Sequence, residues 1–104
     1  FKENCSDVRN SKTMELAKKL SKEVNCINIV DPLVDVEELK SSYQVIVNNV
    51  MEPTTKYDVC IISVPHNDFK EKECTEYLDL LKPNGFIFDV KSMIKEENKN
   101  IIRL

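Results

Sequence analysis

Apolar residues follow two alternating patterns along this chain, and each pattern predicts one type of element. In the first, Met14, Ala17 and Leu20 recur at helical spacing among charged residues, which predicts an amphipathic helix. In the second, nearly unbroken apolar runs are typical of strands buried on both faces of a parallel sheet. The expected helices cover Ser11–Val24, Asp35–Tyr43 and Asp68–Leu81, and the expected strands cover Cys26–Val30, Gln44–Val50, Val59–Val64, Phe86–Val90 and Ile101–Leu104.

Proline and glycine mark the expected ends of two of these elements. Pro32 cannot donate to a strand ladder, so Asp31 is expected at the carboxyl end of its strand. Gly85, the only glycine of the chain, is expected to mark the turn from the third helix into the next strand. The elements therefore alternate between helix and strand.

This alternation predicts a single α/β domain over residues 1–104, doubly wound, with a mostly parallel sheet and helices on both faces. Such a Rossmann-like domain has three layers, and we expect a first strand to precede Phe1. Ligands of these sheets gather at the carboxyl ends of the strands. The polar residues expected there are Asp31, His66, Asn67, Asp68 and Lys91.

Composition narrows the classes of partner. The chain has 104 residues, of which 41% are hydrophobic, and a net charge of −3. This acidic balance argues against a nucleic-acid partner, which would need a concentrated basic surface. No apolar run approaches the roughly 20 residues of a membrane span. The four cysteines lie far apart, without the spacing of a zinc site, so we expect reduced thiols and a cytoplasmic protein.

Three cations stand at places suited to an anionic ligand. Lys2 and Arg9 precede the first helix, where backbone N–H groups and positive charge could hold a phosphate. On charge pattern alone, however, a solvated terminus with an Asp7–Arg9 surface pair is the favoured interpretation. Lys91 follows a buried strand directly, and its pattern favours an anion site and a plain surface residue equally.

The remaining polar candidates give no reaction chemistry. His66, the only histidine, could act as an acid or base, but a structural role in its loop is favoured. Asp31 could accept a ribose hydroxyl, as acids do in dinucleotide folds, yet one glycine cannot supply the required G-x-G-x-x-G turn. No catalytic pair, carboxylate dyad or metal cluster is evident, so the residues predict binding without catalysis.

Five segments of the chain together resemble one known family. They are FKENCSDVRNSK at Phe1–Lys12, IVDP at Ile29–Pro32, YDVCIISVPHNDF at Tyr57–Phe69, LKPNGFIFDVK at Leu81–Lys91 and IIRL at Ile101–Leu104. In this order they resemble the C-terminal domain of the UDP-glucose/GDP-mannose dehydrogenase family over essentially the whole chain. The opening and the FDVK segment resemble most the branch that oxidises UDP-N-acetyl-hexosamines, such as the mannosamine, glucosamine and galactosamine sugars.

The resemblance implies a function and a set of site residues. Enzymes of this family oxidise the C6 alcohol of a nucleotide sugar to a uronic acid with NAD, which implies a role in making surface polysaccharide precursors. Phe1, Lys2 and Lys91 match positions that contact the UDP-sugar substrate. Arg9 matches an arginine that reaches NAD held mainly by the N-terminal domain. The catalytic residues and the NAD loop belong to regions before this chain, so Cys5 is not expected to be the nucleophile.

The resemblance also implies partners, while two other classes stay open. It implies a UDP-sugar substrate, contact with the N-terminal domain of the same enzyme, and a homodimer in the full-length protein, with this chain alone inactive. An S-adenosylmethionine-dependent methyltransferase is one alternative, since Tyr57–Val59 and Leu81–Gly85 resemble its late strands. A non-catalytic receiver-like module is the other.

Overall fold

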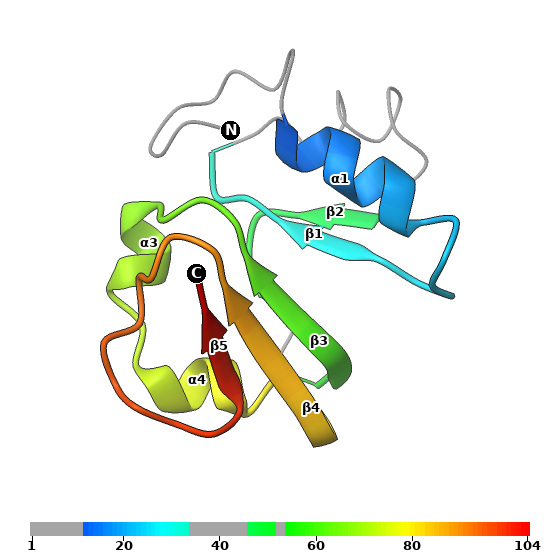
Figure 1. Ribbon diagram of the computed structural model, residues 1–104. Coiled ribbons are helices and arrows are strands. Elements are labelled where there is room, and N and C mark those ends of the chain that lie inside the picture. Colours follow the sequence, from blue (N-terminus) through cyan, green and yellow to red (C-terminus); the bar gives the residue numbers. More distant parts are fainter. Residues whose placement is uncertain (1–11, 34–45, 52–53) are drawn as a thin grey trace. The chain divides into compact units, whose positions relative to one another are not determined.

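A computed structural model describes residues 12–33, 46–51 and 54–104 (Figure 1). The chain forms two compact units, Phe1–Met51 and Glu52–Leu104. None of the helices in the described ranges is long and apolar enough to cross a membrane. The expected helix Asp35–Tyr43 lies outside the described residues.

The first unit contains one helix and a pair of parallel strands. Helix α1 (Lys12–Leu20) ends earlier than expected, and the hydroxyl of Ser21 donates to the Lys18 carbonyl at 2.6 Å just beyond it. This bond satisfies a carbonyl that the helix end leaves without an intrahelical partner. Strands β1 (Asn28–Val30) and β2 (Ile46–Asn48) pair in parallel.

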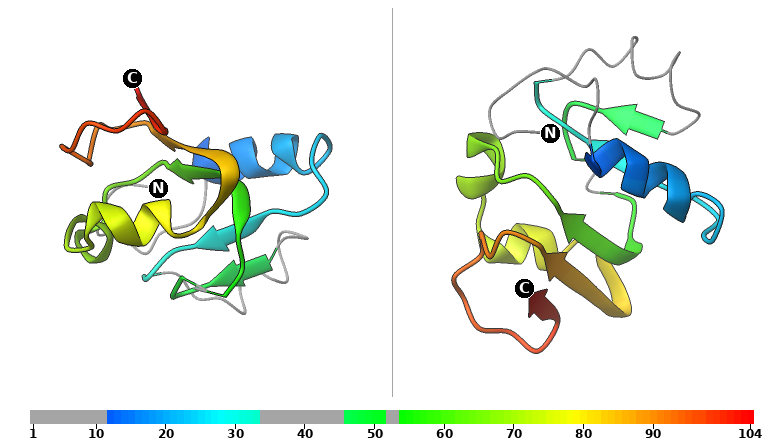
Figure 2. Two further views of the ribbon diagram at one scale, coloured as in Figure 1. Left: turned by 90° about the horizontal axis from the view of Figure 1, so that it is seen from below. Right: turned by 45° about the horizontal axis from the view of Figure 1, so that its top comes forward.

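The second unit is built on a three-stranded parallel sheet. Its strands are β3 (Tyr57–Ile62), β4 (Leu81–Asp89) and β5 (Ile101–Arg103). Figures 1 and 2 show β4 between β3 and β5, with all three strands running in the same direction. The side chain of Ile87 on the central strand is fully buried, as expected for an apolar residue that follows the pattern of a covered strand.

Two short helices connect β3 to β4, where the sequence predicted one long helix over Asp68–Leu81. They are α3 (Asn67–Lys70) and α4 (Cys74–Leu78). The segment between them is entirely charged, so it offers no apolar side chain to hold a continuous helix against the sheet. Glu73 starts a new helix instead, because its backbone N–H donates to the carboxylate of Glu76 at 2.6 Å.

Tyr77 fastens α4 to the rest of the second unit. The ring of Tyr77 is buried, and its hydroxyl donates to the carbonyl of Phe69 at 2.5 Å. Helix α4, which carries Tyr77, packs against β4. Burial raises the pKa of Tyr77, and electrostatic interactions with Cys60, Glu76 and Asp89 are smaller causes in the same direction. The phenol therefore stays protonated and keeps its hydrogen bond across the neutral range.

The prediction that Gly85 marks the turn from a helix into the next strand is wrong. Gly85 lies inside β4, and the positive φ of this stretch, 70°, belongs to Asn84. A Cβ at position 85 would lie 2.9 Å from the Asp58 carbonyl oxygen and 3.0 Å from the Lys82 carbonyl oxygen. The glycine is needed because two backbone segments approach closely where the register of β4 shifts against β3.

The fold is a small α/β arrangement with parallel strands, as the alternating pattern predicted, and its described helices are shorter than expected. The described strands form two separate ladders, one of two strands and one of three, whereas the pattern predicted one sheet. The single doubly wound domain, its helices on both faces and a strand before Phe1 stay predictions.

Candidate functional site

The three-stranded sheet brings the residues that follow each of its three strands to one edge. Because its strands are parallel, the carboxyl ends of β3, β4 and β5 face the same way (Figure 1). We call this edge, formed by residues 63–67 after β3, residues 90–94 after β4 and Leu104 after β5, the carboxyl edge. It is the place where parallel α/β sheets bind ligands.

Lys91 is the cation of the carboxyl edge. It lies two residues beyond the last residue of β4, Asp89, rather than directly after a strand ending at Val90 as predicted. Its side chain is exposed and makes no hydrogen bond or ion pair with any residue in the described ranges. An ammonium group in this state is available to an anionic ligand as a point charge.

Asp89 is the buried acid of the same edge, and it was not among the residues predicted from the sequence. The residue is 0% exposed. Its Oδ1 accepts from the N–H of Met93 at 2.9 Å, and its Oδ2 accepts from the N–H of Ile94 at 2.7 Å. The available signal was an acid within the apolar run Phe86–Val90, because a buried carboxylate needs hydrogen-bond donors.

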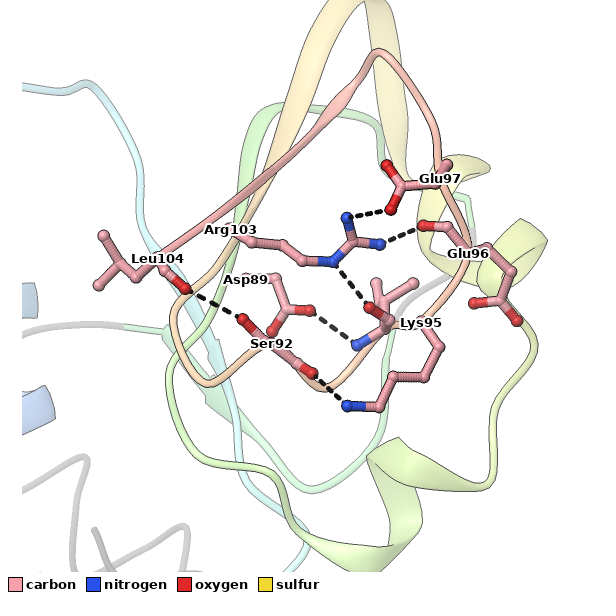
Figure 3. Close-up of polar contacts among 8 residues, drawn as sticks. Asp89, Ser92, Lys95, Glu96, Glu97, Arg103 and Leu104 are labelled. Atoms are coloured by element: carbon pink, nitrogen blue, oxygen red, sulfur yellow. Dashed lines mark hydrogen bonds and ion pairs between the residues drawn. The ribbon is translucent and has the colours of Figure 1, made fainter.

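Arg103, at the end of β5, holds the same segment from the other side (Figure 3). Its Nε donates to the carbonyl of Ile94 at 2.8 Å, and its Nη2 donates to the carbonyl of Glu96. Its Nη1 lies 3.6 Å from a carboxylate oxygen of Glu97. The planar guanidinium thereby ties Ile94, Glu96 and Glu97, in the segment after β4, to the last strand.

Ser92 completes the bonding of the turn. Its backbone has a φ of 53°, in the left-handed region that non-glycine residues seldom adopt. Its hydroxyl donates to the Leu104 carbonyl at 3.1 Å, and its own carbonyl accepts from the Lys95 ammonium at 3.1 Å (Figure 3). The turn that carries Lys91 is thus held by side chains before, after and beside it.

His66 has a structural place in the loop after β3. It is 1% exposed, and its ring meets the ring of Phe69 edge-on at a centroid distance of 5.7 Å. Its carbonyl accepts from the N–H groups of Phe69 and Lys70, at 2.9 and 3.1 Å. These contacts support the structural interpretation over an acid or base role. Asn67 and Asp68, also predicted at strand ends, are exposed residues of α3.

Asp31 closes a local turn in the first unit. It is buried, and its Oδ1 accepts from the N–H of Leu33 at 2.9 Å. Its backbone N–H donates to the Asn48 carbonyl at 3.0 Å, and its carbonyl accepts from the side chain of Asn49 at 2.8 Å. The contacts support a turn-forming role typical of aspartate rather than the ribose contact considered above.

The thiols differ in environment. Cys26, Cys60 and Cys74 are free. Cys26 is exposed, so its predicted burial in a strand is wrong, because β1 begins only at Asn28. Burial raises the pKa of the Cys60 thiol to about 11. Cys5 lies outside the described residues.

No metal site is formed by the described residues. Within these ranges no group of three His, Cys, Asp or Glu side chains could hold a metal ion.

Of the four predicted site residues, the structure places one. Phe1, Lys2 and Arg9 lie outside the described residues, and Lys91 lies at the carboxyl edge. The described part of the site therefore consists of one available cation on a turn that Asp89, Arg103 and Ser92 hold in place. Such an arrangement can bind an anion through the ammonium of Lys91.

Comparison with known proteins identifies the family. A family model described as "UDP-glucose/GDP-mannose dehydrogenase family, UDP binding domain" matches residues 1–96. The UDP-N-acetyl-D-glucosamine 6-dehydrogenase of Salmonella typhi is 31% identical over 101 residues, which are 97% of this chain and 24% of that protein. Protein CapL of Staphylococcus aureus is 31% identical over 97% of this chain and 23% of its own length.

A third relative and the solved structures complete the comparison. The UDP-N-acetyl-D-glucosamine 6-dehydrogenase of Pseudomonas aeruginosa is 30% identical over 100% of this chain and 24% of its own length. No solved structure matches. The chain spans about a quarter of the length of these relatives. On the family match over nearly its full length, the chain belongs to the UDP-glucose/GDP-mannose dehydrogenase family and corresponds to its C-terminal, UDP-binding domain.

Proposed function

We propose that this chain binds the UDP group of a UDP-sugar at the carboxyl edge of its three-stranded sheet. The observation that carries the proposal is Lys91, an exposed cation on a fixed turn at that edge, in a chain that matches a UDP-binding domain. In the whole enzyme the bound substrate is a UDP-N-acetyl-hexosamine, whose C6 alcohol is oxidised to a uronic acid for surface polysaccharide synthesis.

The chemistry of Lys91 suits a diphosphate. A lysine ammonium is a compact charge that binds phosphate oxygens through charge-assisted hydrogen bonds. The chain as a whole has a net charge of −3, so attraction of the diphosphate must come from particular cations rather than from the overall charge. Lys91 and, within the proposal, Lys2 are these cations, and Phe1 is a further contact to the UDP-sugar.

The residues of this chain do not fit the main binding site of NAD. A pyrophosphate cradle needs a glycine-rich turn between strand and helix, and the only glycine lies within β4 at a close backbone crossing. NAD, which accepts the hydride in the whole enzyme, is therefore held by the preceding domain in our proposal. Arg9 reaches toward it from this chain, and the full enzyme is a cytoplasmic homodimer.

Titration of UDP into the 104-residue chain, followed by amide NMR shifts, tests the proposal. We expect the largest shifts among the described residues in the segment 90–94, because Lys91 contacts the ligand there. In Lys91→Ala these shifts should shrink at equal UDP concentration. The control Lys99→Ala removes an exposed lysine that precedes β5 and so lies away from the carboxyl edge, and it should leave the shifts unchanged.

Two further ligands separate the alternatives. S-adenosylmethionine tests the methyltransferase interpretation, and Mg²⁺ tests the receiver-like one. Shifts with either of these ligands and none with UDP would overturn the proposal.

Arg9 is tested in the whole dehydrogenase. We expect Arg9→Ala to raise the KM for NAD more than the KM for the UDP-sugar, because the proposed contact of Arg9 is with the cofactor. Steady-state kinetics with each substrate varied in turn measures both constants. Equal increases in the two constants would contradict the role assigned to Arg9.

A further inference from the structure

We propose that Asp89 is a positioning residue for UDP binding, which acts by fixing the turn that carries Lys91. The inference rests on the proposed function, because it assumes that Lys91 contacts UDP. It adds to the site a residue that has no direct contact with the ligand.

The hydrogen bonds of the Asp89 carboxylate hold the turn that follows β4. The residue is 0% exposed, and a buried acid is costly unless hydrogen bonds replace its water. Both oxygens receive one, from the N–H groups of Met93 and Ile94. These donors follow Lys91 in the chain whereas Asp89 precedes it, so the two bonds close the turn around Lys91.

The two ends of this turn are tied to neighbouring strands. At its start the N–H of Val90 donates to the carbonyl of Ile62, the last residue of β3, at 3.0 Å. At its end Ile94 is held on both sides, its N–H by Asp89 and its carbonyl by the Arg103 side chain of β5. Lys91 has no side-chain partner of its own in the described ranges, so its position depends on this turn.

A fixed turn lowers the cost of binding. Ligand binding must order any mobile segment that contacts the ligand, and a segment that is already ordered saves this entropy. Without the Asp89 bonds, the left-handed backbone of Ser92, with its φ of 53°, would also lose part of what holds it there.

Charge and positioning predict opposite effects for Asp89→Asn. The substitution removes a negative charge two residues from Lys91, so electrostatics alone predicts tighter binding of an anion. Asparagine also replaces one acceptor oxygen with an amide that cannot accept from an N–H, so the positioning role predicts weaker binding. The sign of the change in affinity therefore separates the two.

A double-mutant cycle in the 104-residue chain tests the proposal. Calorimetry with UDP measures the dissociation constants of the parent chain, Asp89→Asn, Lys91→Ala and the double variant. We expect Lys91→Ala to weaken UDP binding about tenfold and Asp89→Asn to weaken it about fivefold. In the Lys91→Ala background, Asp89→Asn should change the affinity less than twofold. Hydrogen exchange at Met93 and Ile94 should become faster in Asp89→Asn.

The outcomes distinguish this inference from the proposed function. Unchanged UDP affinity in Lys91→Ala would overturn both. Suppose that Lys91→Ala weakens UDP binding as expected. The positioning role alone would then be overturned if Asp89→Asn bound UDP more tightly than the parent chain, or if it weakened binding equally with and without Lys91. If Asp89→Asn does not fold, Asp89→Glu takes its place in the cycle, because glutamate keeps the charge but its longer side chain cannot present both oxygens to the N–H groups of Met93 and Ile94 in the same way. A loss of UDP affinity that occurs only when Lys91 is present supports the positioning role, and equal losses with and without Lys91 overturn it.

Discussion

Asp89 and Lys91 are two residues apart but have opposite environments, and both environments follow from where the strand ends. Asp89 is the last residue of β4 and faces inward, fully buried, whereas Lys91 lies in the following turn and is exposed. A cation directly after an apolar run made Lys91 easy to single out in the sequence, but the pattern alone favoured an anion site and a plain surface residue equally, and the family resemblance assigned it to the substrate. Asp89 could not be predicted from the sequence, because its role depends on hydrogen bonds from two backbone N–H groups that only the folded turn brings to its carboxylate.

The thiols give a prediction at the same scale. Burial raises the pKa of Cys60 to about 11, so very little of its reactive thiolate exists at pH 8, whereas Cys26 is exposed. We expect iodoacetamide at pH 8 to alkylate Cys60 at least about tenfold more slowly than Cys26, as measured by mass spectrometry of peptides. The rate at Cys60 should still be rising between pH 9 and the folded pKa.

Unfolding supplies the control for this experiment. In concentrated urea both thiols are solvated, so their alkylation rates should become similar. Equal rates for Cys60 and Cys26 in the folded protein would show that β3 does not shield its thiol.

At the scale of elements, the type of structure was predictable but several boundaries were not. The apolar runs located the described strands, and the helical spacing located α1. The long helix expected over Asp68–Leu81 is divided, because charged residues 70–73 and the Glu73–Glu76 capping bond favour a break. Strand β4 begins at Leu81, before the predicted turn, and this early start depends on pairing with β3, which a local pattern does not reveal.

The register shift in β4 gives a prediction for Gly85. We expect Gly85→Ala to lower the free energy of unfolding by roughly 1–3 kcal/mol, the usual cost of overpacking. The added Cβ would lie 2.9 and 3.0 Å from two backbone carbonyl oxygens, which cannot move aside as a flexible side chain would. Urea unfolding followed by circular dichroism measures the change.

An exposed position provides the comparison for Gly85. Lys99→Ala should change the free energy of unfolding by less than about 0.5 kcal/mol. If Gly85→Ala were equally mild, the close crossing of the two backbone segments would not constrain position 85.

At the scale of the whole molecule, the family explains more than the fold alone. Two compact units and two parallel ladders are compatible with many functions, because a fold by itself does not specify a reaction. The segments that resemble the dehydrogenase family, from Phe1–Lys12 to Leu81–Lys91, identified it from the sequence, and the family match over residues 1–96 confirms it. The residues of this chain did not predict any reacting groups, and the chain spans about a quarter of the length of its relatives.

The central claim is that Lys91 binds the diphosphate of UDP, and the most direct test is its contribution to UDP affinity. Calorimetry should compare the parent chain with Lys91→Ala and with Lys99→Ala, which removes the same charge elsewhere. We predict about tenfold weaker binding in Lys91→Ala, as expected for one charge-assisted hydrogen bond, and parent-like binding in Lys99→Ala. Equal affinity in all three proteins would contradict the claim.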